Sequence, residues 1–309
     1  MFKIEKPGIY TDVPVSDYFE DCCPEPSLTQ SIAKILLEKS PLHAWHAHPR
    51  LNPDYFPDDN TKYDIGNIAH SIMLGRGKTI VVVPDAEDWR TKAAQQGRAA
   101  AAADGKLAVL GKHYAKAQRM LVAARAQLEL RRLSHIFIEG DGDAEVVLAW
   151  QETGTGGWCR QMVDWLTPDP DRSTFVDYKT TDMSVAPHNL GRMMVSAGWP
   201  IQAAMAERGL KALNPLGYRR RYLFVVQETE PPYCLNVVEM SEGAMTMGAK
   251  MLDMAVAIWR HCMANDRWPG YPAEIVTPEY PGWHEQQWLE REVKDAARGR
   301  MLNDHIMAG

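Results

Sequence analysis

The chain has 309 residues, of which 45% are apolar and 24% charged, and its formal net charge is −6. This composition is typical of a soluble globular protein with a sizeable core, and no apolar run approaches the roughly 18 residues that a membrane-spanning helix needs. The acidic balance disfavours a protein that coats DNA through bulk positive charge.

The N-terminus and the cysteines bear on location and redox chemistry. The first ten residues, MFKIEKPGIY, lack the apolar stretch of a signal peptide, so we expect a cytoplasmic protein. No C-x-x-C pair occurs among the five cysteines, which are Cys22, Cys23, Cys159, Cys234 and Cys262. We therefore expect free thiols rather than a zinc knuckle, an iron–sulfur cluster or a disulfide framework.

The first third of the chain predicts helices. Ser27 and Gln30 form an S-x-x-Q capping box, and the amphipathic helix that follows should end near Ser40, because Pro41 comes next. Residues 51–62 are rich in Pro, Asp and Asn and indicate a loop. Further helices are predicted from about residue 64 and over residues 111–133, with a short buried strand, TIVVV, at residues 79–83.

From residue 134 the pattern changes to short segments rich in β-branched and aromatic residues, separated by turn formers. These segments predict a β-meander with strands over residues 134–139, 143–151, 158–167 and 173–179. A helix over 187–210, two strands over 219–227 and 233–240, a helix over 241–265 and a charged final helix should follow. The order favours an α/β domain with a mixed central β-sheet flanked by helices.

Two acidic residues lie inside apolar strands. Alternation places Asp164 on the same face as Arg160, and Asp177 on the same face as Lys179. Because a tight turn joins these strands as a hairpin, the two carboxylates can lie a few ångströms apart. Taken alone, an Asp-x-Lys pair is more often an ordinary ion pair than a catalytic one.

Two buried carboxylates repel each other unless a cation neutralises them. A hard divalent cation with oxygen ligands meets this need, and magnesium suits such a site. A lysine beside the second acid can hold the attacking water and help to deprotonate it, which fits in-line attack on a phosphodiester. The pattern therefore indicates metal-dependent phosphodiester hydrolysis.

The run Asp164–x12–Asp177–x–Lys179 resembles the PD-(D/E)xK nuclease superfamily, with Val163 where proline often stands. The segment GNIAH at residues 66–70 resembles the upstream G-x-x-x-H motif of the branch with RecB-type and RecE-type nucleases. Gln202 stands where that branch has its Q-x-x-x-Y motif. The phrases SLTQSIAKILLEKSPLHAWHAHP and WPGY also resemble RecE-like (exodeoxyribonuclease VIII-like) exonucleases of phages and prophages.

The resemblance covers about residues 5–285 and implies a restriction-endonuclease-like core. We expect a single nuclease domain over residues 1–285, with the catalytic core at about 64–240, and a charged helical tail over 286–309. The implied catalytic residues are Asp164, Asp177 and Lys179, the implied ligands of Mg²⁺ (or Mn²⁺) are His70, Asp164, Asp177 and the Tyr178 carbonyl, and the implied substrate contact is Gln202.

Five residues keep a second interpretation. His70 also fits a half-buried histidine at a packing seam, and Gln202 fits an ordinary polar residue of an amphipathic helix. Ala206 stands where the branch has tyrosine, which puts any role of that tyrosine in doubt. Arg160 either binds DNA phosphate or only balances the acids, and Glu145 is either an outer acid of the metal site or part of a structural ion pair.

The resemblance implies an exodeoxyribonuclease that hydrolyses one strand of linear duplex DNA from an end, 5′ to 3′, and leaves a 3′ single-stranded tail for recombination. Its implied partners are double-stranded DNA ends and a RecT-like annealing protein in a bacterial or phage-infected cell, and no membrane is involved. The alternatives are a structure-specific or single-strand endonuclease of the same superfamily, or a catalytically inactive DNA-binding recombination protein. A closed homo-oligomeric ring would reconcile the acidic chain with sustained contact with DNA.

Overall fold

The computed structural model describes residues 2–56, 65–84, 86–154, 156–167, 172–213 and 219–307, and for residues 172, 219 and 301–307 the backbone alone. The chain divides into two compact units, Met1–Gly270 and Tyr271–Gly309. The second unit contains the helix α10 (Gly282–Met307), and the expected boundary at residue 285 falls inside this helix. None of the described helices combines the length and the hydropathy that spanning a bilayer requires.

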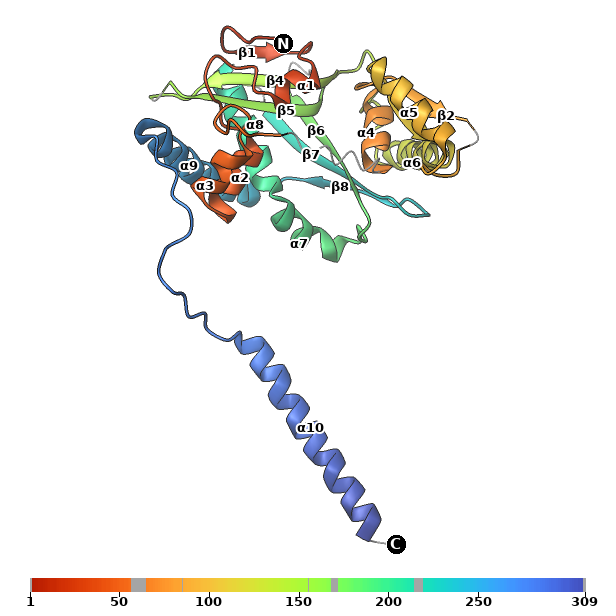
Figure 1. Ribbon diagram of the computed structural model, residues 1–309, viewed down its shortest axis with the longest axis vertical. Coiled ribbons are helices and arrows are strands. Elements are labelled where there is room, and N and C mark those ends of the chain that lie inside the picture. The colour runs from red at the N-terminus through yellow and green to blue at the C-terminus, as the bar shows by residue number, and fades with distance from the viewer. Residues whose placement is uncertain are drawn as a thin grey trace. The chain divides into compact units, whose positions relative to one another are not determined.

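A six-stranded sheet forms the centre of the first unit, in the order β1-β4-β5-β6-β7-β8 (Figure 1). Its strands are β1 (Gly8–Tyr10), β4 (Asp143–Gln151), β5 (Trp158–Thr167), β6 (Arg172–Thr181), β7 (Arg219–Glu228) and β8 (Leu235–Glu239). Only β6 and β7 run parallel among these described strands. A parallel pair needs a crossover, which α7 (Pro187–Ala197) and α8 (Trp199–Leu213) supply. The mixed α/β sheet expected from the sequence is confirmed.

Helices cover both faces of this sheet. On one face, α8 packs with α2 (Gln30–Glu38) and α9 (Glu242–Asn265), and the ring of Trp199 stacks on Phe224 with centroids 5.0 Å apart. On the other face lie α4 (Ile65–Leu74) and α6 (Gly111–Leu130). Successive residues of β6 alternate between the two cores, since Phe175 joins the first and Val176 the second.

A small parallel pair of strands, β2 (Ile80–Val83) and β3 (Leu107–Leu110), lies outside the main sheet. The helix α5 (Lys92–Ala103) connects them and packs on both. The sequence pattern predicted β2 but neither α5 nor β3. The alanine-rich run at residues 99–103 was the sequence signal for α5, because alanine has the highest helix propensity.

The start of the chain differs from the capping-box prediction. Thr29 caps α2, and its Oγ1 accepts a hydrogen bond from the backbone N of Ile32 at 3.3 Å. Ser27 instead donates its hydroxyl to Asp21 at 2.8 Å, inside a buried polar cluster. A short helix α1 (Val15–Phe19) precedes this cluster.

Proline begins a helix after α2 rather than only ending one. Ser40 caps the helix α3 (Pro41–Ala47), and Pro41 occupies its first turn, where a missing N–H costs no intrahelical bond. The helix predicted over 187–210 is also divided, into α7 and α8, at Gly198. The φ of Gly198 is 75°, a left-handed conformation that glycine adopts at little cost.

The strand predicted over residues 134–139 is not formed. Its backbone makes turns, and Phe137 has a φ of 62°. The guanidinium of Arg125 on α6 donates to the carbonyls of Ile136 at 2.8 Å and Phe137 at 2.7 Å, in place of a strand neighbour. Of the apolar side chains that suggested a strand, Ile136 and Phe137 are buried in the same core as α6, whereas Ile138 is exposed.

The closest helix contact in the core predicts a sensitive position. A Cβ on Gly248 of α9 would lie 2.0 Å from the carbonyl oxygen of Pro200 in α8, a backbone atom that cannot move aside without separating the helices. Gly248→Ala should therefore lower the free energy of unfolding by about 1–3 kcal/mol. Denaturant titration of the variant measures this loss.

Gly243→Ala on the same helix is the matched control, because the nearest atom to its Cβ would be Ser241 Oγ at 4.0 Å. Its stability should be unchanged or slightly higher, since alanine favours helix over glycine. Equal stabilities of the two variants would contradict the close packing of α8 on α9.

Candidate active site

The two predicted acids lie where β5 and β6 separate. Pairing between β5 and β6 runs from the hairpin turn as far as Trp165 and Val176. The next residues along the two strands, Asp164 and Asp177, do not pair. Asp164 Oδ2 instead accepts a hydrogen bond from the backbone N of Tyr178 at 2.8 Å. A carboxylate thus takes the place of a strand neighbour, and the sheet opens at this point.

The first layer of helices brings His70 to this opening. His70 lies on α4, and its Nε2 is 3.0 Å from Asp164 Oδ2. Its ring lies 6.2 Å from the ring of Tyr178, centroid to centroid. The imidazole is therefore directed at the predicted metal site.

The second layer brings Gln202 from the opposite face of the sheet. Gln202 is buried on α8, and its Nε2 donates to Asp177 Oδ2. The other oxygen, Oδ1, forms an ion pair with Lys179, whose side chain is still partly exposed. Asp164, Asp177, Lys179, His70 and Gln202 thus form one contiguous group, as the sequence predicted.

Burial and mutual repulsion set the charges of the two acids. Burial and the charge of Asp164 raise the pKa of Asp177 to about 6, although Lys179 and His70 act against this rise. Burial also acts to raise the pKa of Asp164, but the hydrogen bond and charge of His70 outweigh it, and this pKa lies below its usual value. Asp164 is therefore ionised at neutral pH, and Asp177 resists ionisation.

The two basic groups respond to the same acids. Burial acts to lower the pKa of His70, but its hydrogen bond to Asp164 and the charges of both acids raise it overall. Burial likewise acts to lower the pKa of Lys179, while Asp177 and Asp164 raise it above its usual value. The negative charge of the two acids thus favours the protonated forms of His70 and Lys179 when no other cation is present.

The donor set fits a hard divalent cation. In a strand, the N–H and C=O of one residue point to the same edge, so the Tyr178 carbonyl faces the opening together with the N–H that binds Asp164. Two carboxylates, this carbonyl and one imidazole are ligands that magnesium or manganese accept. As the described side chains lie, they are paired with one another, and no three of them converge with metal-ligand spacing.

Glu145 lies beside this group on β4. Residues 144 and 146 pair with Trp165 and Val163, which places Glu145 opposite Asp164, but its φ of 55° interrupts the ladder there. Burial and the charge of Asp164 raise the pKa of Glu145, while His70 and Arg76 act to lower it. Glu145 is thus a third acid within electrostatic reach of the site.

Arg160 is placed differently from the prediction that it contacts DNA. Its side chain is 3% exposed, and its Nη1 lies 2.8 Å from Asp21 Oδ1. Its Nε donates to the carbonyl of Tyr18 at 3.1 Å. The guanidinium is fully engaged in a buried cluster that also contains His48, whose Nε2 lies 3.3 Å from Asp21 Oδ2. It balances neither catalytic acid and cannot reach a phosphate.

Ala206 has no access to the site. It is fully buried in the core between α8 and the sheet. The tyrosine that the resemblance implies four residues after Gln202 therefore has no counterpart at this position.

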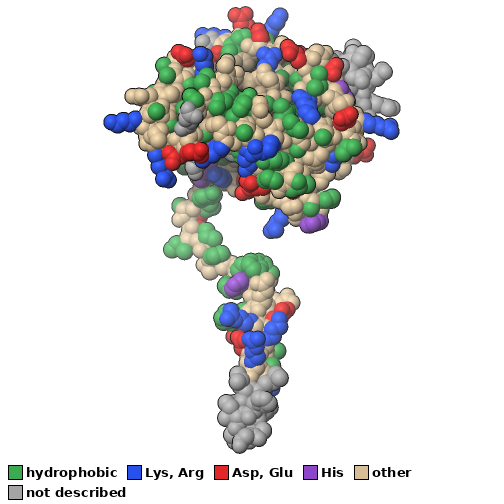
Figure 2. All heavy atoms as spheres, turned by 90° about the vertical axis from the view of Figure 1, so that its right-hand side faces the viewer, with side chains coloured by type: hydrophobic (Ala, Val, Ile, Leu, Met, Phe, Trp, Pro, Cys, Tyr) green, Lys and Arg blue, Asp and Glu red, His purple; other side chains and the backbone are tan. Residues whose placement is uncertain are grey.

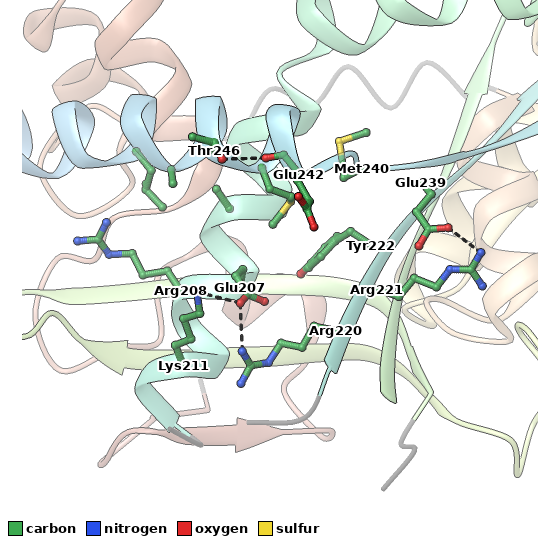
Figure 3. Close-up of a pocket in the computed structure, with 14 residues that line it drawn as sticks. Glu207, Arg208, Lys211, Arg220, Arg221, Tyr222, Glu239, Met240, Glu242 and Thr246 are labelled. Atoms are coloured by element: carbon green, nitrogen blue, oxygen red, sulfur yellow. Dashed lines mark hydrogen bonds and ion pairs between the residues drawn. The ribbon is translucent and has the colours of Figure 1, made fainter. Parts of the chain in front are cut away.

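A cavity of about 700 Å³ lies between α8, β7, β8 and the start of α9 (Figure 3). Its charged side chains are largely paired with one another, since Arg220 lies 3.1 Å from Glu207 and Arg221 lies 2.8 Å from Glu239. Tyr222 faces this space and stacks on Phe175. None of the predicted site residues lines the cavity.

The comparison with known families agrees with this geometry. A model described as a "PDDEXK-like domain of unknown function (DUF3799)" matches residues 31–277. The chain belongs to this family. This match confirms the PD-(D/E)xK superfamily that was expected from the sequence. It also supports the assignment of the protein as a nuclease. No curated protein resembles the chain closely enough to count as a relative.

A solved structure shares the fold. A Eubacterium rectale protein named "Putative exonuclease" superposes with a TM-score of 0.56 at 10% identity, over 87% of this chain and 96% of that one. At this identity the likeness concerns the fold alone. SSO0001 (TM-score 0.24, 12% identity, 61% and 84% covered) and LHK-Exo in complex with dAMP (0.22, 16%, 65% and 98%) are more distant.

The raised pKa of Asp177 predicts a pH dependence of the metal-free protein. Because its pKa is about 6 in the folded state and about 3.9 when unfolded, the folded state binds more protons between these values. Stability should fall as the pH rises from about 4.5 through 6. Asp177→Asn should remove this slope and exceed the parent by about 1–2 kcal/mol at pH 7.5 in EDTA.

Urea unfolding across this pH range measures the slope. Asp253→Asn is the control, since Asp253 is an exposed acid paired with Arg208 outside the site. Parallel stability profiles for the parent and Asp177→Asn would show that Asp177 ionises normally.

Proposed function

We propose that the protein is a magnesium-dependent exodeoxyribonuclease that hydrolyses one strand of linear duplex DNA from an end, 5′ to 3′. The observation that carries this proposal is the convergence of Asp164, Asp177 and Lys179 at the opening between β5 and β6. His70 and Gln202 bind the same two carboxylates from opposite faces of the sheet. A solved structure named a "Putative exonuclease" shares the fold, and its name supports the choice of exonuclease over endonuclease.

His70, Asp164, Asp177 and the Tyr178 carbonyl would hold the metal. A divalent ion supplies positive charge that stabilises the charge developing on the phosphate and its leaving oxygen. With the metal held there, Lys179 would be free to turn from Asp177 toward the attacking water. A positioned ammonium orients that water and favours loss of its proton.

If Asp177 holds the metal, the amide NH₂ of Gln202 would no longer be needed by that carboxylate and would donate to a non-bridging oxygen of the scissile phosphate. Burial of Gln202 on α8 would keep this donor beside the site and limit the reorganisation that the reaction requires. The product would be a 3′ single-stranded tail that a RecT-like annealing protein can bind.

Loss of the catalytic groups should abolish cleavage without unfolding the protein. Asp177→Ala and Lys179→Ala should each reduce the rate about 100-fold or more, equivalent to roughly 3 kcal/mol of transition-state stabilisation. Lys39→Ala, an exposed lysine at the end of α2, should keep the parent rate. End-labelled linear duplex provides the rate, and a covalently closed circle of the same sequence should resist digestion.

The metal requirement has its own readout. Magnesium or manganese should support cleavage, whereas calcium should bind and support little, because its coordination is longer and looser. Each ion should raise the melting temperature of the parent, since it binds the folded state alone. Identical shifts in the parent, Asp164→Asn and Asp177→Asn would place the ion elsewhere, and digestion of the closed circle would indicate an endonuclease.

We also propose that the protein acts as a ring of three or four identical subunits. The acidic chain attracts DNA weakly at physiological salt, where screening acts within about 8 Å, and enclosure of the duplex would keep it bound. Digestion of long linear duplex should then continue after excess competitor DNA is added. Light scattering that gives only the monomer mass, with digestion that stops on adding competitor, would refute the ring and leave the nuclease assignment intact.

A further inference from the structure

The acidic net charge conceals a basic segment. Between Arg76 and Arg132 the chain has twelve Lys and Arg against five Asp and Glu, a formal charge of +7. The rest of the chain consequently has a charge of −13. We call Arg76–Arg132 the basic segment. A nuclease that must hold a polyanion has its positive charge concentrated here.

The basic segment lies on the His70 side of the sheet. It begins directly after α4 and includes β2, α5, β3 and α6, which pack on one another and on α4. Figure 2 faces the side of the molecule where these elements lie, and shows Lys and Arg side chains spread across it, with Asp and Glu between them. Only those cations without an acidic partner can attract phosphate strongly.

Most cations of the segment already have partners. Arg125 and Arg131 donate to backbone carbonyls, and Lys116 lies 2.6 Å from Glu230. Arg90 and Lys106 each lie next to an aspartate, at 3.7 Å and 3.0 Å. These five side chains hold the fold together or are neutralised locally.

Arg76, Lys78, Lys92, Lys112 and Arg132 are the exposed cations of the described segment whose side chains form neither an ion pair nor a hydrogen bond. Two of them occupy the turn that leaves α4, in the sequence Gly75-Arg76-Gly77-Lys78. Gly75 and Gly77 have φ values of 63° and 95°, and a Cβ on Gly75 would meet no atom within 4 Å. The backbone of this turn is therefore open to a large ligand.

The turn lies close to the reacting groups. It follows the helix that contributes His70, only six residues after that ligand. The guanidinium of Arg76 is near enough to Glu145 to lower its pKa, and Glu145 stands opposite Asp164. Positive charge thus borders the acidic site on the side away from Gln202.

We propose that the turn Gly75–Lys78 binds the phosphate backbone of duplex DNA beside the scissile bond, with Arg76 and Lys78 as the contacts. This inference rests on the proposed nuclease function and assigns the part of the surface that holds its substrate. Phosphate contacts of this kind fix the register of DNA without reading its sequence. The turn resolves the conflict between an acidic chain and a polyanionic substrate.

The test compares two double variants of equal charge change. Arg76→Gln with Lys78→Gln removes the two unpaired cations of the turn, and Arg90→Gln with Lys106→Gln removes two paired cations of the same segment. Anisotropy of a fluorescent 20-base-pair duplex, in calcium without turnover, gives Kd over a series of salt concentrations. The first variant should weaken binding about tenfold or more and reduce the slope of log K against log salt by about 2. The control should stay within twofold and keep the slope.

Melting curves of both variants should match the parent, because all four side chains are exposed. An unchanged salt slope in the Arg76/Lys78 variant, with cleavage and binding otherwise intact, would overturn the inference and leave the nuclease standing. An equal loss in the control variant would also overturn it, since the charge alone and not its place would then matter. A parent protein that neither binds nor cleaves duplex would refute the proposed function itself.

Discussion

The repulsion between Asp164 and Asp177 is the constraint around which the rest of the site is built. Both carboxylates are held inside a hydrophobic sheet, where a second negative charge is expensive. His70, Lys179, Gln202 and a backbone N–H each offset part of that cost. A protein that only needed stability would place apolar residues here. A bound cation would neutralise the remaining negative charge of the two acids, which accounts for their placement here.

The sheet provides the geometry because β5 and β6 stop pairing at these two acids. Separation of the strands opens a gap that a ladder would have closed, and it lets helices on opposite faces reach the same point. His70 arrives from α4 and Gln202 from α8. The candidate catalytic group is thus assembled from four elements, of which only β5 and β6 are neighbours in sequence, and these elements pack in the two cores on either side of the sheet.

The sequence predicted the acids, their lysine and most sheet strands, because alternation and burial act locally. It failed where a distant partner decides the conformation. Strand alternation places Arg160 on the same face as Asp164. Its side chain nevertheless pairs with Asp21, 139 positions earlier, and no local pattern in the sequence reveals that pairing. Residues 134–139 have strand composition, but carbonyl bonds from Arg125 hold them in turns. No local pattern in the sequence marks Arg76, because its proximity to Glu145 depends on where the fold places the turn after α4.

The buried cluster around Arg160 ties the start of the chain to the strand that bears Asp164. Tyr18, Asp21 and Ser27 contact the guanidinium, so the N-terminal segment is packed against β5 through this cluster. Shortening the protein past Asp21 would leave a positive charge alone in the core, a defect that typically costs about 3–5 kcal/mol. The damage would arise four positions from a catalytic acid. For anyone redesigning the enzyme, fusion partners belong at the C-terminal end, and the first thirty residues are best left intact.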